Sequence, residues 1–220
     1  DRQNLGVIFA RPEIGKTSFA AWLCGWYVKN NLNVAYWGNE EPVRKTRMRV
    51  AKSIFELSRQ EILLDRNSFI ENYRHKVLPY ATFMDCVGTS IQEIEDYCFR
   101  NEVDVVFIDQ LDKVRIDGEF SRGDERLKEL YARSRELAKR NKVAVWAVSQ
   151  ASYEAHGREI IDYSMLDGSK TGKAGEADII IGIGVSEHED FRTLKFSKNK
   201  INGYHGSIVL RRDGDRDIFL

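Results

Sequence analysis

The chain has 220 residues, with 34 basic and 34 acidic side chains, so its formal net charge is zero. With zero net charge, the chain as a whole does not attract a highly charged partner, so any nucleic acid must be bound by a local basic surface. Hydrophobic residues make up 42% of the chain and charged residues 31%, which favours a soluble globular protein over a disordered one. No apolar run approaches the ~18 residues of a membrane span, and no secretory signal stands at the start.

Length and cysteine content narrow the class of protein further. Residues 1–220 suffice for one α/β domain with a sizeable core, and the chain opens almost directly on its first strand, so we expect a fragment of a longer protein. Cys24, Cys86 and Cys98 are odd in number and lack metal-ligand spacing. Reduced, mostly buried thiols in a cytosolic protein are therefore expected.

The most informative segment is a loop between an apolar run, Leu5 to Phe9, and a stretch of apolar residues at helical spacing. It reads Ala10, Arg11, Pro12, Glu13, Ile14, Gly15, Lys16, Thr17 and then Ser18. A Gly-Lys-Thr sequence between a strand and a helix predicts a phosphate-binding loop, because its N–H groups and the helix N-terminus favour anionic oxygens.

Each residue type in this loop has a chemical reason to be there. Gly15 lets the backbone approach phosphate, Lys16 places a charge on the β- and γ-phosphates, and the Thr17 hydroxyl is a Mg²⁺ ligand. Ala10 stands where the pattern has its first glycine, which a small residue replaces if φ is negative. The alternative is a helix start after an ordinary turn.

The remaining chain alternates between strand and helix patterns. Strands are expected at 33–38, 76–84, 104–109, 143–149 and 178–185, a hairpin at 192–198 and 206–212, and a short last strand at 217–220. Helices are expected from 18, over 43–57, from a capping box at 90–93 to about 101, and over 125–141. Segment 60–86 is hard to assign and is expected to begin with a short helical piece, and 151–173 has no clear period and is expected to be a mobile functional stretch. The alternation predicts one three-layer α/β domain with a mainly parallel sheet and a C-terminal antiparallel hairpin.

Polar residues stand at the carboxyl ends of several expected strands, where open parallel sheets bind ligands. Asp109 closes an apolar run and is predicted to orient Mg²⁺; otherwise it caps a loop. Glu40 or Glu41 is a candidate general base for an attacking water, or else an acid that faces a helix dipole. Gln150 is predicted to hydrogen-bond a γ-phosphate, or else to be a satisfied loop amide.

Taken in order, these segments resemble a known family, the RecA-like helicase domain of DnaB and of the phage primase-helicases. The resemblance extends over essentially the whole chain and is poorest over 60–86. It is carried by 10–17, 39–41, 107–111, 148–150, 166–169, 177–178 and 197–200 with Gly203 and Gly206. The loop alone would indicate only a P-loop protein, whereas the segments in this order are much more specific.

The resemblance implies roles for particular residues. Glu40 matches the catalytic glutamate and Gln150 the γ-phosphate sensor. Lys198 and Lys200 match a Lys-x-Arg pair that reaches the nucleotide of a neighbouring subunit, although Lys200 lacks the planar fork of arginine. The residues that fall in the loop facing single-stranded DNA are Gly168, Ser169, Lys170 and Lys173.

The resemblance also implies a function and its partners. We expect residues 1–220 to be an ATP- or dTTP-hydrolysing, Mg²⁺-dependent RecA-like helicase domain that moves 5′ to 3′ on single-stranded DNA within a homo-hexameric ring, in bacterial or phage-infected cytosol. No aromatic stands near Lys170 or Lys173 in the sequence, so contact with DNA phosphates is expected rather than base stacking. A RecA-type recombinase and a non-catalytic ATP-binding clamp are the alternatives.

Overall fold

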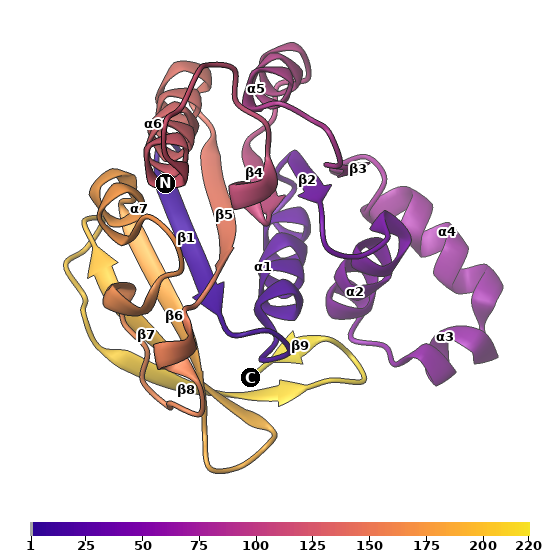
Figure 1. Cartoon of the computed structure of the whole chain (residues 1–220). Helices are drawn as coiled ribbons and strands as arrows, with labels where there is room; N and C mark the ends of the chain where they lie inside the picture. The colour runs from indigo at the N-terminus through magenta and orange to yellow at the C-terminus, as the bar shows by residue number, and fades with distance from the viewer. Residues whose placement is uncertain (1) are drawn as a thin grey trace.

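The computed structural model describes residues 2–220 and is built on a nine-stranded sheet (Figure 1). The strands are β1 (Leu5–Ala10), β2 (Val34–Gly38), β3 (Ala81–Asp85), β4 (Val105–Asp109), β5 (Ala144–Gln150), β6 (Ile179–Val185), β7 (Phe191–Asn199), β8 (Ser207–Asp213) and β9 (Ile218–Phe219). Their order in the sheet is β3-β2-β4-β5-β1-β6-β7-β8-β9. The half from β3 to β6 is parallel and the half from β6 to β9 is antiparallel, which confirms the predicted fold class.

Strand β1 lies between β5 and β6, and its last residue, Ala10, pairs with Gln150 and Ile183. All six of its residues are buried, as expected for a strand covered on both faces. The carboxyl ends of β1, β2, β4 and β5 therefore meet at one edge of the sheet, and the loops that follow them form one surface.

Helices cover both faces of the sheet (Figure 1). They are α1 (Lys16–Lys29), α2 (Val43–Phe55), α3 (Arg59–Leu64), α4 (Arg66–Lys76), α5 (Ile91–Arg100), α6 (Gly123–Asn141) and α7 (Lys170–Glu176). One apolar core joins α1 and α2 to the sheet, and a second joins α5 and α6 to its other face. Helices α3 and α4 lie outside α2 (Figure 1).

The segment 60–86 differs from its prediction in one respect. The strand expected from Lys76 begins only at Ala81, because α4 extends to Lys76 and a turn containing Pro79 follows, with Ala81 N–H donating to Val77 O at 2.9 Å. Asp65 caps α4 by accepting from Ser68 N–H at 3.1 Å. None of the residues of α4 is buried, so the helix leaves no apolar period to detect in the sequence.

The segment 151–173 is also more ordered than its sequence indicates. A bridge joins Ala151 to Leu166, and α7 begins at Lys170. Two 3₁₀ turns, Tyr153–Ala155 and Tyr163–Met165, occupy the stretch between them. These short pieces explain the lack of a clear period.

Two global expectations can be compared with the described residues. Cys24, Cys86 and Cys98 are all buried and unbonded, and burial raises the pKa of each thiol. Within residues 2–220, no helix combines the length and the apolar character needed to cross a membrane.

Gly184 on β6 provides a test of the packing. A Cβ built there would lie 1.8 Å from the carbonyl oxygen of Glu159, so the 158–161 segment crosses β6 too closely for a side chain at this position. We expect Gly184→Ala to lower the free energy of unfolding by about 1–3 kcal/mol, as overpacking does in well-packed interiors. The measurement is urea unfolding.

Gly175 on α7 is the matched control, because a Cβ there meets nothing within 4 Å. Gly175→Ala is expected to be neutral or to stabilise by up to about 1 kcal/mol, since alanine is the better helix former. Equal unfolding midpoints for the two variants would contradict this packing.

Candidate nucleotide site

The predicted phosphate-binding loop connects the carboxyl end of β1 to the first turn of α1. Ala10 remains in the strand with negative φ, fully buried between β5 and β6, which explains why glycine is not required there. Gly15 has φ +109°, a conformation that favours glycine, and its carbonyl accepts the first helical hydrogen bond from Phe19 N–H at 2.9 Å. The loop thus brings Lys16 and Thr17 to the start of a helix, beside the ends of neighbouring strands.

Acidic residues from β2 and β4 meet this helix start. Lys16 is only 4% exposed, and its ammonium forms an ion pair with Glu40, which follows β2 and is 38% exposed. Thr17 Oγ1 donates to Asp109 Oδ2 at 3.2 Å, which joins the loop to the end of β4. The sequence placed these four side chains at strand ends, and the fold brings them together.

The environment of Asp109 fits a divalent cation. Its side chain is 1% exposed, and Oδ1 is buried without a hydrogen-bond partner among the described residues. Burial raises the pKa of the Asp109 carboxyl to about 6, an effect that the positive charge of Lys16 opposes and the negative charge of Glu40 reinforces. A carboxylate and a hydroxyl side by side are the hard oxygen ligands that Mg²⁺ takes, so Asp109 and Thr17 would hold it.

Arg49 on α2 also belongs to the site, although it was not distinguished in the sequence from the other basic residues of its helix. It donates to Glu41 from Nε at 2.9 Å and from Nη2 at 3.4 Å, whereas the neighbouring Glu40 pairs with Lys16, and both glutamates line the same cavity. Its Nη1 reaches Ser18 Oγ at 3.2 Å and Asp217 Oδ1 at 3.0 Å. Arg49 therefore connects the phosphate-binding loop, the segment after β2 and the C-terminal segment.

These residues surround a cavity of about 260 Å³. Its lining consists of Glu13, Gly15, Lys16, Thr17, Ser18, Glu40, Glu41, Arg49 and Arg212. Three of the lining residues carry a positive charge and three a negative one. The presence of Arg212, from β8, was not anticipated from the sequence.

Gln150 connects this cavity to the expected DNA loop through the backbone. Ala151 N–H donates to Ala10 O at 2.9 Å, at the start of the phosphate-binding loop, and Asp167 N–H donates to Gln150 O at 3.0 Å. Asp167 immediately precedes Gly168. A movement of the end of β5 would therefore displace both the phosphate-binding loop and the expected DNA loop.

Lys173 does not lie where a DNA-contacting residue must lie, and this part of the prediction is corrected. Its side chain is 0% exposed, and Nζ donates to Asp112 Oδ2 at 2.5 Å and to Ser149 Oγ at 2.9 Å. The ammonium also lies 5.4 Å from the ring centroid of Tyr131. Lys173 therefore fixes α7 against the end of β5, a role that sequence spacing could not distinguish from that of a surface cation.

The other residues of the expected DNA loop are accessible. Gly168 has φ +71° and is exposed, Ser169 precedes α7, and Lys170 pairs with Glu154 at 3.3 Å while remaining 42% exposed. An aromatic pair lies nearer than the sequence indicated: Tyr153, next to Glu154, is 77% exposed and stacks on His156 with ring centroids 5.7 Å apart.

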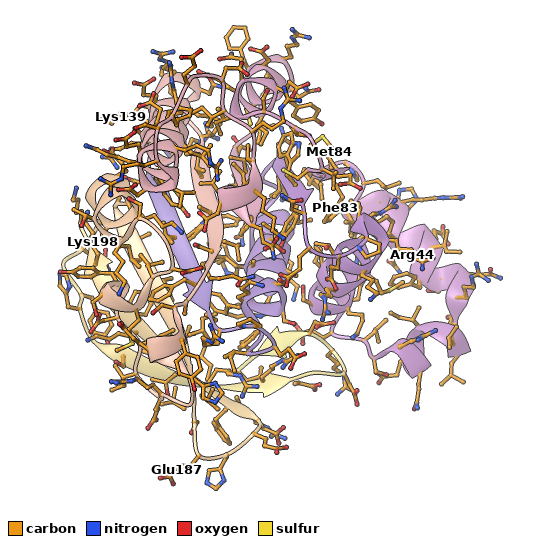
Figure 2. The ribbon with its side chains drawn as sticks, in the orientation of Figure 1. Arg44, Phe83, Met84, Lys139, Glu187 and Lys198 are labelled. Atoms are coloured by element: carbon orange, nitrogen blue, oxygen red, sulfur yellow. The ribbon has the colours of Figure 1, made fainter. Side chains whose placement is uncertain are left out.

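Lys198 and Lys200 lie at the opposite edge of the sheet from the phosphate-binding loop. Lys198 lies near the end of β7, which is antiparallel to β6, and Lys200 follows that strand. Lys200 N–H donates to Asp178 O at 2.8 Å, beside the start of β1. Lys198 lies beside α7 and donates to the carbonyl of Gly175 at 3.3 Å (Figure 2). The length of β1, roughly 16 Å at about 3.3 Å per residue, separates this edge from the loop of the same chain.

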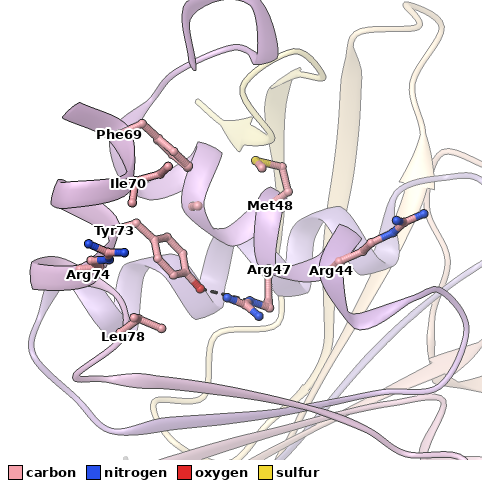
Figure 3. Close-up of a pocket in the computed structure, with 9 residues that line it drawn as sticks. Arg44, Arg47, Met48, Phe69, Ile70, Tyr73, Arg74 and Leu78 are labelled. Atoms are coloured by element: carbon pink, nitrogen blue, oxygen red, sulfur yellow. Dashed lines mark hydrogen bonds between the residues drawn. The ribbon is translucent and has the colours of Figure 1, made fainter. Parts of the chain in front are cut away.

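A second hollow, of about 390 Å³, lies between α2 and α4 (Figure 3). Apolar side chains such as Met48, Phe69 and Ile70 line it, and Arg47 donates to Tyr73 OH at 3.3 Å. None of the predicted site residues lies in it, so it is separate from the nucleotide cavity.

The fold and the cavity define a RecA-like P-loop nucleotide-binding domain. Residues 1–209 match the family model of the DnaB-like helicase C terminal domain, and the chain belongs to this family. A solved ATPase domain is similar with a TM-score of 0.87 and 19% identity, over 100% of this chain and 85% of that one. A DnaB-like replicative helicase, solved with its interactions with primase, has a TM-score of 0.83 and 19% identity, over 100% of this chain and 59% of that one. A comparison with curated proteins finds no match.

The raised pKa of Asp109 predicts a pH-dependent cost of ionising it. The folded chain binds the Asp109 proton more tightly than the unfolded chain does, so stability falls as pH rises from the unfolded pKa toward 6. Asp109→Asn removes this cost. We compare the free energy of unfolding of Asp109→Asn with that of the wild type, both in EDTA. The difference in favour of the variant is expected to increase by about 1 kcal/mol between roughly pH 5 and pH 8.

Urea unfolding at the two pH values measures this difference. Asp112→Asn serves as a second carboxylate variant, because it removes the hydrogen bond between Asp112 and Lys173 and leaves Asp109 in place. A gap between Asp109→Asn and wild type that is the same at both pH values would contradict the environment described for Asp109.

Proposed function

We propose that this chain is the motor domain of a replicative DNA helicase, which hydrolyses ATP or a related triphosphate such as dTTP and moves 5′ to 3′ on single-stranded DNA. The observation that supports this most is the meeting of Lys16, Thr17 and Glu40 in one cavity, with Asp109 bonded to Thr17, in a chain of the DnaB-like family. Residues 1–220 act as one domain of a longer protein.

In this proposal the Lys16–Glu40 ion pair is exchanged when the triphosphate binds. The N–H groups of the loop and the Lys16 ammonium take the β- and γ-phosphate oxygens, and Glu40 is released to accept a proton from the attacking water. Asp109 and Thr17 would bind the metal ion next to the phosphate-binding loop. Mg²⁺, when bound, supplies positive charge for the β- and γ-oxygens.

The two lysines at the far edge of the sheet act on another subunit. Lys198 and Lys200 are too far from their own loop to touch its nucleotide, which supports a role at the nucleotide of a neighbour. A closed ring of six copies, in which every subunit has a neighbour on each side, would satisfy this requirement. The ammonium groups would offset charge on the transferring phosphoryl group.

DNA contact is proposed for Gly168, Ser169 and Lys170. The positive φ of Gly168 and the exposed ammonium of Lys170 suit a loop that follows a phosphate backbone. Gln150 senses the γ-phosphate and is joined to this loop through Asp167. Loss of the γ-phosphate would thereby alter the grip on DNA.

The proposal is tested by phosphate release with Mg²⁺, with and without single-stranded DNA, alongside the mass of the assembly. We expect DNA to raise the rate several-fold, because the DNA loop and the nucleotide cavity share the end of β5. Lys16→Ala is expected to abolish release. Ordinary turnover in that variant would rule out this site, and a wild-type chain that binds nucleotide without releasing phosphate would be a clamp instead.

Strand assays separate the motor from the recombinase. Displacement of a strand from a forked duplex supports the helicase, whereas exchange between homologous duplexes without displacement supports the recombinase.

The neighbouring glutamates provide a matched pair of variants. We expect Glu40→Gln to lower the hydrolysis rate by about 100-fold or more while ATP still binds, because a general base typically contributes 10²–10⁴-fold. Glu41→Gln weakens a contact to Arg49 and is expected to keep most of the rate. Hydrolysis and nucleotide binding are measured on both. The reverse order of the two variants would reassign the base to Glu41.

A further inference from the structure

Arg212 reaches the phosphate-binding loop from the far end of the sequence. It stands near the end of β8, where its N–H donates to Asp190 O at 2.6 Å. Its guanidinium lies against Gly15, because a Cβ built on that glycine would be 3.6 Å from Nη1 and 3.8 Å from Nε. Arg212 also lines the same cavity of about 260 Å³ as Lys16 and Thr17.

The guanidinium of Arg212 is unpaired among the residues that the structure describes. Within residues 2–220 it forms no ion pair and no hydrogen bond, and its Nε is buried without an acceptor. The nearby arginines differ: Arg49 is bonded to Glu41 and Asp217, and Arg216 to Glu61 and Asp213. A buried donor on a charged group without an acceptor is costly, so an acceptor from outside the chain is expected.

A second guanidinium adds to the positive charge on this side of the loop. Arg192 is 8% exposed and donates only to carbonyl oxygens, among them Ile14 O at 2.7 Å. Burial and the positive charge of Arg212 both lower the pKa of Arg192. The nearby charges of Asp190 and Glu189 oppose this effect, but no described carboxylate forms an ion pair with either arginine.

The carboxylates of the cavity do not satisfy Arg212. Glu40 is paired with Lys16 and Glu41 with Arg49. Glu13 is exposed and has no ion pair within the described chain. Among the described residues, no carboxylate that lines the cavity is therefore bonded to Arg212.

We propose that Arg212 binds a phosphate of the nucleotide held by the loop of its own chain, an inference that rests on the proposed function. Its planar fork fits two phosphate oxygens, which the ammonium groups of Lys198 and Lys200 cannot match. Glu40 and Asp109 approach β1 from the β2–β4 side of the sheet, whereas Arg212 approaches from the β8 side. Its partner is thus a phosphate that stays with the diphosphate product.

The test is the affinity for Mg²⁺-ADP, measured by titration calorimetry. We expect Arg212→Ala to weaken binding by about tenfold or more, as the loss of a charged hydrogen-bonded contact does. Arg211→Ala is the matched control, because Arg211 is the preceding residue on β8, is exposed and does not line the cavity. Its affinity is expected to stay within about twofold of wild type.

Competition by inorganic pyrophosphate identifies the part of the nucleotide that is contacted. We expect Arg212→Ala to weaken pyrophosphate binding by the same factor as ADP binding. A loss for ADP without a loss for pyrophosphate would overturn the proposal in favour of a contact to the sugar or base. A folded Arg212→Ala chain with wild-type ADP affinity would also overturn it, and Arg212→Gln carries the same test if the alanine variant does not fold.

Wild-type measurements separate this proposal from the one it rests on. If the wild-type chain hydrolyses ATP and Arg212→Ala binds ADP normally, only the role of Arg212 is rejected. If the wild-type chain binds ADP but never hydrolyses ATP, the motor function is rejected, and a tenfold loss in Arg212→Ala still supports the phosphate contact.

Discussion

The site depends on one constraint: the ammonium of Lys16 is almost completely buried and must have an anion beside it. Burying an unpaired charge is prohibitive, and the chain meets this need with Glu40. A phosphate is an equivalent partner in the same place. The cavity is therefore compatible with both states, because one anion can replace another without leaving the ammonium unpaired.

Other charged groups around Lys16 are also paired where they are buried. Arg49 is held between Glu41 and Asp217, and Asp217 is itself only 3% exposed and also pairs with Lys52 at 2.8 Å. The last residues of the chain are thus fixed to α2 by buried charge, and they position the end of β8. A segment about 200 residues from the phosphate-binding loop in sequence becomes part of the wall of its cavity.

Local features of the fold were predictable from the sequence, and contacts between distant segments were not. The strand before Ala10, the helix after Gly15 and the strand that ends at Asp109 each carry their own pattern of apolar residues. The bounds of helix α4 could not be read within the short helical piece expected there, because it buries none of its residues, and α7 was missed because only seven residues form it.

The site residues also fall into those that local patterns predict and those that depend on contacts between distant segments. Lys16, Thr17, Glu40 and Asp109 stand at strand ends, and that rule is enough to bring them together. Lys173 was misjudged because burial against Asp112, 61 positions away, leaves no trace in its neighbours. Arg49 and Arg212 were not singled out, since their partners lie in segments that meet only in the folded chain.

The antiparallel direction of β7 has a consequence for stoichiometry. It puts the two lysines at one edge of the sheet and the phosphate-binding loop at the other, so one copy offers half a site at each edge. Under the proposed function, complete sites exist only at boundaries between copies. An open row of copies then has one complete site fewer than it has members, and only closure into a ring makes the two numbers equal.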